Sequence, residues 1–158
     1  GGGAATMAEK SIYAFRESAH RAGKDWKLGE GLSLGIFYHL ADSRERGIRE
    51  ITPFYEEHVK MFGPLGFVPG ITPAQLAAST KRGGWDAAGV PRVEDYMKVG
   101  AWFAGPPEDL VAYLRELESR FPGLEYVHLS NSMGTPKTVM VEQLAWLGKE
   151  VMPHFTGR

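Results

Sequence analysis

The side chains best suited to bind a charged ligand lie in a stretch rich in glycine and proline, residues 63–95. Arg82 in this stretch is followed directly by Gly83 and Gly84. A guanidinium binds phosphate or carboxylate through paired hydrogen bonds, and glycine gives the backbone freedom to move. Connections of this length are commonly lids or binding loops. We therefore predict a long mobile loop over 63–95 with Arg82, Gly83 and Gly84 as cofactor-binding residues; the alternative is a solvated surface loop.

Two histidines stand near the ends of apolar runs that resemble buried strands. His39 falls near the end of residues 32–40, and His128 near the end of residues 124–129. Barrel enzymes place their chemistry at the carboxyl ends of strands, and alternate residues of a strand share a face. His39 and His128 are therefore candidates to line a cofactor pocket, and the alternative is a hydrogen-bonded packing role. The other histidines lie on predicted helices or in the tail, where we expect solvent: His20, His58 and His154.

A third polar group follows the second apolar run. Ser130, Asn131, Ser132 and Gly134 lead into a helix predicted to begin at Thr135. Hydroxyls and free backbone N–H groups at a helix N-terminus can hold a phosphate. Ser130 is therefore a further candidate for cofactor binding, and the alternative is that Ser132 and Thr135 only cap the helix.

Composition excludes several classes of function. The 158 residues contain no cysteine, which removes disulfides, thiolate nucleophiles and cysteine-ligated metals and suits a cytoplasmic protein. No metal-binding motif and no nucleophile elbow are present, so we predict no metal. The net charge of −1 carries no footprint for nucleic acid. No apolar stretch approaches the length of a membrane span, so we expect no membrane partner.

The candidate residues need an α/β framework to position them. Apolar periodicity predicts helices at about residues 7–23, 44–62, 107–121 and 135–152, and strands at 32–40 and 124–129. Alternation of this kind is typical of parallel strands joined by helical crossovers.

Three places in this framework have special features. Pro53 lies inside the second helix and predicts a kink, or a restart with Thr52 as the new cap. A short helix is predicted over Pro73–Ser79 with Thr72 as its cap. Residues 96–104 fit helix and strand equally well.

Three segments resemble the bacterial luciferase-like, flavin-dependent monooxygenases. They are the strand-to-helix passage Leu32–Gly47, the helix start GPPEDLVAYLREL at Gly105–Leu117, and the final helix VEQLAWLGKEVMPHF at Val141–Phe155. The glycine-rich stretch 63–95 also falls where that family carries a mobile loop over its active site. Together these segments cover most of residues 8–156.

The resemblance implies a (β/α)8, TIM-type barrel. Such a barrel takes about 250 residues, so residues 8–156 are expected to form its C-terminal portion, after a flexible leader or cloning remnant at residues 1–7. The family's catalytic histidine comes from earlier strands and has no counterpart here, so the catalytic residues are unassigned.

The resemblance also implies a reaction and partners. The expected cofactor is reduced FMN, with a deazaflavin as the alternative, and the expected reaction is oxidation of a small organic substrate by dioxygen. We expect a homo-oligomer, or association with a missing N-terminal half, because a partial barrel leaves strand edges unpaired. The alternative function is a non-catalytic flavin-binding or structural half-barrel that self-associates.

Overall fold

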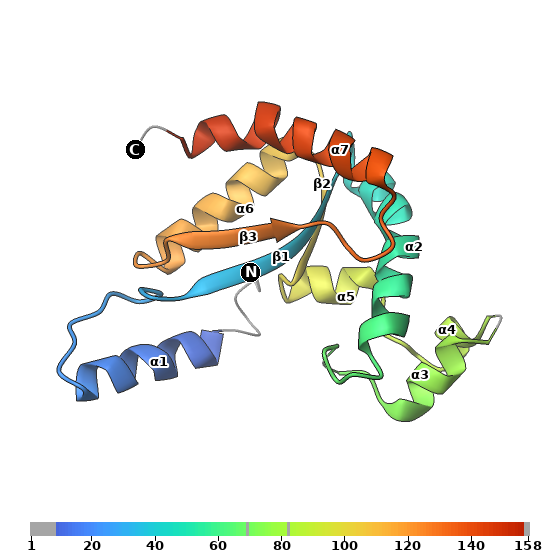
Figure 1. Ribbon diagram of the computed structural model, residues 1–158, viewed down its shortest axis with the longest axis horizontal. Coiled ribbons are helices and arrows are strands. Elements are labelled where there is room, and N and C mark those ends of the chain that lie inside the picture. Colours follow the sequence, from blue (N-terminus) through green and yellow to red (C-terminus); the bar gives the residue numbers. More distant parts are fainter. Residues whose placement is uncertain (1–8, 69, 82, 157–158) are drawn as a thin grey trace.

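The computed structural model describes residues 9–68, 70–81 and 83–156 (Figure 1). Arg82 and the leader predicted at residues 1–7 lie outside the described residues. The elements, in chain order, are α1 (Glu9–Arg21), β1 (Ser33–Leu40), α2 (Arg44–Phe62), α3 (Pro73–Ser79), α4 (Gly84–Ala87), α5 (Val93–Lys98), β2 (Trp102–Gly105), α6 (Pro107–Arg120), β3 (Tyr126–Ser130) and α7 (Lys137–Trp146), which continues into a π-helical turn η1 (Leu147–Val151) and a 3-10 turn η2 (Met152–His154).

The three described strands form a small parallel sheet in the order β2-β1-β3. Phe37 on the central strand β1 is the register partner of Trp102 on β2 and of Ser130 on β3. The predicted mixed α/β class with parallel strands is therefore confirmed. The sheet is open, because β2 and β3 lie on opposite sides of β1 and do not pair in the described part of the chain.

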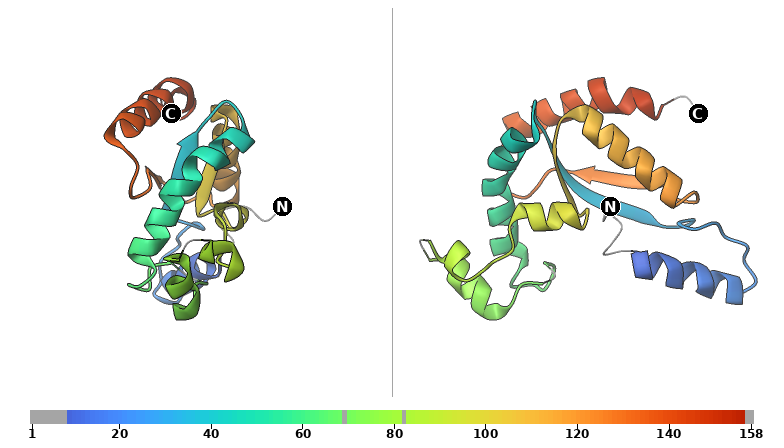
Figure 2. Two further views of the ribbon diagram at one scale, coloured as in Figure 1. Left: turned by 90° about the vertical axis from the view of Figure 1, so that its right-hand side faces the viewer. Right: turned by 180° about the vertical axis from the view of Figure 1, so that it is seen from behind.

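Helices cover the sheet on both faces (Figure 2). On one face, α6 and the end of α7 pack over the alternate strand residues Ile36, Tyr38, Leu40 and Phe103, all in one buried cluster. On the other face, α2 packs over Trp102 and Ala104 through a second buried cluster, to which it contributes Ile51, Tyr55 and Val59. Side chains alternate between the two faces along each strand. The carboxyl half of the sheet is therefore buried on both faces, by one cluster on each.

Helix α2 runs without a break from Arg44 to Phe62, although Pro53 lies inside it. The predicted restart at Thr52 is therefore wrong. The Thr52 hydroxyl donates to the carbonyl of Ile48 at 2.6 Å and does not cap a new helix. Loss of one backbone bond at proline costs about 3 kcal/mol, and burial of the stripe that includes Tyr55 and Val59 outweighs this because each such side chain contributes about 1.5–3 kcal/mol.

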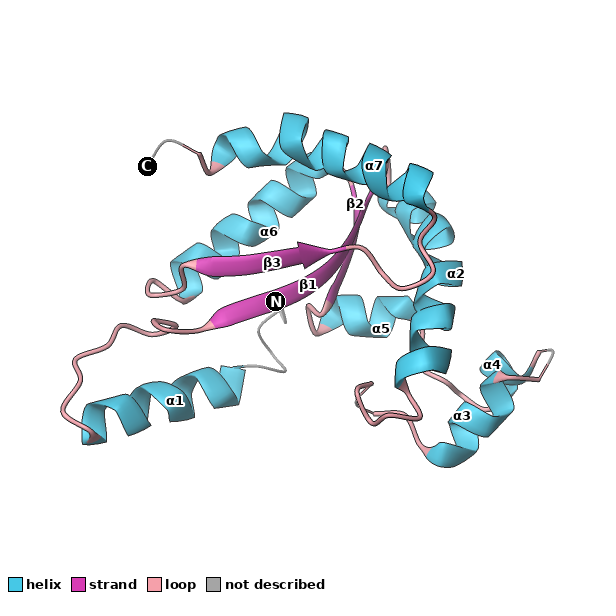
Figure 3. Ribbon diagram, in the orientation of Figure 1, coloured by secondary structure: helices cyan, strands magenta, loops and turns pink. Residues whose placement is uncertain are grey.

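The stretch predicted as one long loop, residues 63–95, contains α3, α4 and the first turn of α5 (Figure 3). The helix predicted at Pro73–Ser79 is confirmed with its cap: Thr72 accepts from the Gln75 amide, and the Gln75 side chain accepts from the Thr72 amide. Glycine content alone does not predict the other two helices. They form because apolar side chains in this stretch, including Val68, Trp85 and Val93, pack against α2.

Residues 96–104 divide into helix and strand. Helix α5 ends at Lys98, Gly100 turns the chain with φ +75°, and β2 begins at Trp102. The helix predicted at about residues 135–152 carries an apolar repeat of Met140, Leu144, Leu147 and Val151, and only half of this repeat is buried. Leu147 and Val151 are buried, whereas Met140 and Leu144 are exposed, because the residue that faces the sheet from the first part of α7 is Gln143. Because Gln143 is polar, a pattern of apolar residues does not identify it as the buried residue of that helical turn.

Candidate functional site

A groove of about 600 Å³ opens where β3 leaves the sheet beside β1. Its floor includes Phe37 of β1, and one rim is the segment that begins at Ser130, the last residue of β3. In α/β sheets and in barrels alike, ligands bind at the carboxyl ends of the strands. The groove is lined by Phe37, His58, Phe62, Phe67, Ser130, Asn131, Ser132, Met133, Gly134, Thr135 and Met140.

One wall of the groove is a set of contacting rings. The His58 ring lies 4.6 Å from the Phe37 ring and 4.7 Å from the Phe62 ring, centroid to centroid. Phe67 continues the set at 6.3 Å from Phe62, and its side chain is 71% exposed. Flat aromatic walls pack well against flat aromatic ligands. This wall therefore suits a planar ring system, with Phe67 at the exposed end.

The rim that begins at Ser130, opposite the wall of rings, is polar and is hydrogen-bonded to α2. The buried Ser132 hydroxyl donates to the carbonyl of Phe54 on α2 at 3.0 Å. The Thr135 hydroxyl donates to the carbonyl of Ser132 at 2.7 Å. The helix cap of α7 is Pro136, without a side-chain bond. The alternative explanation for Ser132 and Thr135, helix capping, is therefore wrong: both hydroxyls hold the rim in shape.

His58 is the functional candidate that the sequence prediction missed. It was expected in solvent, but its ring lies among Phe37, Phe62 and Trp102 at the groove wall. Burial lowers the pKa of the His58 imidazole, so the ring is neutral at pH 7. Its position seven residues after Ile51 and four before Phe62 was a usable signal, because that spacing places it beside the apolar stripe of α2.

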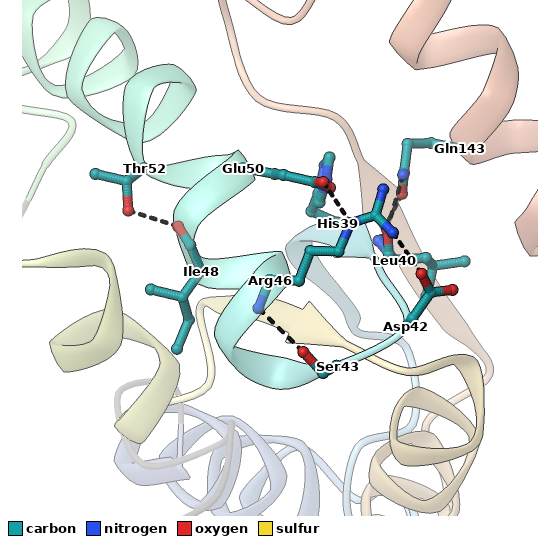
Figure 4. A network of polar contacts seen from close by, with 9 residues as sticks. All are labelled: His39, Leu40, Asp42, Ser43, Arg46, Ile48, Glu50, Thr52 and Gln143. Atoms are coloured by element: carbon teal, nitrogen blue, oxygen red, sulfur yellow. Dashed lines mark hydrogen bonds and ion pairs between the residues drawn. The ribbon is translucent and has the colours of Figure 1, made fainter.

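His39 belongs to a different set of contacts, at the end of β1 (Figure 4). The ring is buried, and its Nε2 lies 2.9 Å from the Glu50 carboxylate. Arg46 donates from Nε to the same carboxylate at 2.7 Å and forms an ion pair with Asp42. Burial raises the pKa of Glu50, but the hydrogen bonds from Arg46 and His39 outweigh burial, and the net pKa is below its ordinary value.

This network ties β1 to α2 and lies outside the groove lining. The geometry of His39 matches the packing alternative, in which a hydrogen-bonded histidine joins two elements. An imidazole held by a carboxylate has a fixed orientation, and here the contact joins the end of β1 to α2.

The remaining predicted site residues do not converge on one place. Ser130 lines the groove. His128 lies two residues earlier on β3, exposed and opposite Gly35. Gly83 and Gly84 begin α4 and do not line the groove. A Cβ on Gly84 would lie 2.0 Å from the Ala78 carbonyl oxygen, so close packing of α4 on α3 explains that glycine.

The described lining of the groove carries no lysine, arginine or carboxylate. Glu57 lies against Gly134 at the rim, and its carboxylate pairs with Lys60 at 2.8 Å. Uncharged hydroxyl and amide groups are therefore what the groove offers to the polar part of a ligand.

Comparisons with known proteins add no family to this description. The sequence matches no protein-family model and no curated protein. Within residues 9–68, 70–81 and 83–156, no helix has the length and apolar character needed to cross a membrane. Over the same ranges, no three histidine or carboxylate side chains gather in a way that could hold a metal ion.

Proposed function

We propose that this chain binds the ring system of reduced FMN in the groove and forms the C-terminal part of a flavin-dependent monooxygenase of the luciferase-like type. The observation that carries the proposal is the groove itself: an aromatic wall faces hydroxyl and amide groups at the carboxyl end of β3, beside Phe37 of the parallel strand β1. A volume of about 600 Å³ lies within the range of small-molecule sites. A deazaflavin has a ring system of the same shape, and the same groove would take it.

The groove fits the flavin ring better than the flavin phosphate. Phe37 and Phe62 offer faces for the ring, and Ser130 and Asn131 can hydrogen-bond to its polar edge. When bound, reduced flavin supplies the electrons with which dioxygen transfers one oxygen atom to an organic substrate. The work of the chain is to orient the ring and to exclude water, for which Met133 and Phe67 lie at the exposed side of the groove.

A partial barrel agrees with the way in which β3 is covered. Tyr126, His128 and Ser130 face one side of β3 and are exposed, whereas Val127 and Leu129 on the other side pack into the cluster beneath α6 and η1. In a (β/α)8 barrel the helices lie outside and the opposite strand faces line the interior. We propose that β1 and β3 are neighbouring strands of a barrel that departs from the regular (β/α)8 form, because β1 lies between β2 and β3 and α2 covers the inner face of β1 and β2.

The proposal predicts that FMN binding depends on the aromatic wall. Replacing Phe67 with alanine is expected to weaken FMN binding about two- to tenfold, because a ring contact is worth about 0.5–1.5 kcal/mol and 1.4 kcal/mol is tenfold. Flavin fluorescence quenching during titration with protein measures the dissociation constant. Phe67 is 71% exposed, so its loss removes little core packing.

Leu65 supplies the matched control for this titration. It lies in the same turn, is 61% exposed and does not line the groove, so Leu65→Ala should bind FMN like the wild type. If FMN keeps its free fluorescence in the oxidised form, and its free absorbance spectrum after anaerobic reduction, at the highest wild-type concentration, this chain has no flavin site and the proposal is wrong.

Self-association is the second candidate function. In the described sheet the outer edges of β2 and β3 are unpaired, and Val141 and Leu144 form an exposed apolar strip on α7. We expect the sedimentation coefficient to rise with concentration, and Leu144→Glu to reduce that rise because it places a charge on the strip. The control is Met61→Glu, an equally exposed site on α2. A wild-type chain that sediments as a monomer at all concentrations contradicts this candidate.

A further inference from the structure

Three aromatic rings contact His58 on its buried side. Phe37 of β1, Phe62 of α2 and Trp102 of β2 surround the imidazole, with centroid distances of 4.6, 4.7 and 5.4 Å. Its Nδ1 is buried and has no hydrogen-bond partner among the described residues. A buried polar atom without a partner is unusual in a folded protein and calls for a functional explanation.

On the side away from these three rings, His58 faces the groove. Because His58 lines the groove and Nδ1 is enclosed, Nε2 is the nitrogen that a ligand can reach. A neutral imidazole offers one donor and one acceptor, and its lowered pKa keeps it neutral near pH 7. Nε2 is therefore a fixed, uncharged hydrogen-bonding atom on an otherwise aromatic wall.

The charges near the groove also restrict the ligand. No lysine or arginine is among the described lining residues, and the nearby Lys60 ammonium is paired with the Glu57 carboxylate at 2.8 Å. A phosphate or carboxylate group would lose its hydration here without gaining a cationic partner, which is unfavourable.

We propose that the groove selects uncharged, planar aromatic ligands and that Nε2 of His58 forms the hydrogen bond that fixes their orientation. This inference rests on the proposed function in one respect, that the flavin ring is such a ligand. It adds that the phosphate of FMN contributes nothing to binding by the described groove and that His58 is a specificity-determining residue.

The first experiment compares riboflavin with FMN, which share a ring and differ in the phosphate. We expect dissociation constants that agree within about threefold, which is less than 1 kcal/mol. A preference for FMN of about tenfold or more would overturn the selection of uncharged ligands. If neither flavin binds, the proposed function fails, and 2-naphthol against 2-naphthoate then tests the inference separately: naphthol should bind at least about tenfold more tightly, and equal or reversed affinities would overturn it.

The second experiment replaces His58, with riboflavin as the ligand or with 2-naphthol if neither flavin binds. His58→Gln keeps an amide near the position of Nε2 and should bind within about threefold of the wild type, whereas His58→Leu should weaken binding about tenfold through loss of one hydrogen bond. Nitrogen NMR of the wild-type imidazole supplies a readout that packing alone would not move: the Nε2 resonance should shift on ligand addition and the Nδ1 resonance should shift less. Equal binding by the leucine variant and the wild type, equal losses in both variants, or an Nε2 resonance that does not move would each overturn the role of His58.

Discussion

Replacing Gln143 with leucine is expected to lower the free energy of unfolding by about 2–6 kcal/mol, because it leaves two buried backbone groups without partners at about 1–3 kcal/mol each. The Gln143 side chain is buried and reaches across 103 residues of sequence to Leu40. Its Oε1 accepts from the Leu40 amide at 2.6 Å, and its Nε2 donates to the Leu40 carbonyl at 3.0 Å (Figure 4).

The reason for these two bonds lies in the sheet. Strand β3 ends at Ser130, whose register partner on β1 is Phe37, so β1 runs three residues beyond the last pair. The Ala41 amide donates to Gly105 on the β2 side, and alternate residues of a strand direct their backbone groups to opposite sides. The backbone N–H and C=O of Leu40 therefore point to the side of β1 on which β3 has already ended. The side-chain amide of Gln143 forms the hydrogen bonds that a neighbouring strand would otherwise form there.

Urea unfolding followed by circular dichroism measures this loss. Glu142→Leu is the matched control, because Glu142 is the neighbouring residue on α7 and is exposed; its free energy of unfolding should stay within about 0.5 kcal/mol of the wild type. A Gln143→Leu variant as stable as that control would show that Leu40 finds other partners, and the account of this helix–strand contact would be wrong.

Replacing Trp102 with alanine is expected to cost about 3–5 kcal/mol of unfolding free energy and to abolish ligand binding in the groove. The Trp102 side chain is 5% exposed and stands under the groove wall. Its ring meets Tyr55 at 5.2 Å with an interplanar angle of 88°, and lies 4.7 Å from Phe37. Alanine at this position leaves a cavity, so Phe37 on β1 and Tyr55 on α2 both lose the ring against which they pack.

Two further variants separate the packing role of Trp102 from a general effect of losing tryptophan. Trp102→Phe retains a ring and should recover part of both the stability and the flavin binding. Trp26→Ala removes a less buried tryptophan that contacts Phe15 near α1, and it should cost about 1 kcal/mol and leave flavin binding unchanged. If Trp102→Ala unfolds like the wild type or binds riboflavin with unchanged affinity, the support of the groove by this ring is refuted.

Much of the local structure was predictable because it depends on neighbouring residues. The helix at Pro73–Ser79 follows from Thr72 and Gln75, whose side chains and amides bond to each other within four residues. Helix α6 begins at Pro107, where the sequence places proline before two acidic residues. The helix predicted at about residues 44–62 follows from apolar spacing, and Ile51, Tyr55 and Val59, which lie on that spacing, are buried.

The errors fall where distant contacts compete with local signals. Pro53 predicts a kink or a restart by local rules, but there is no restart, because packing of α2 on β2 keeps the helix continuous. His58 was expected in solvent because of its place on a predicted helix, but rings from β1 and β2 enclose one side of it. Ser132 fits a cap by position, but its hydroxyl bonds to α2 instead.

The amino-acid sequence by itself determined the α/β class, the parallel strands, the main helices and the polar segment that begins at Ser130, because periodicity, capping and turn residues act over a few positions. Only the tertiary structure decided where a ligand can bind. The groove combines residues from β1, from the end of α2 and from the segment after β3. These residues lie together because β1 pairs with β3 and α2 packs on the sheet face that carries Phe37. Spacing along the chain does not specify these contacts.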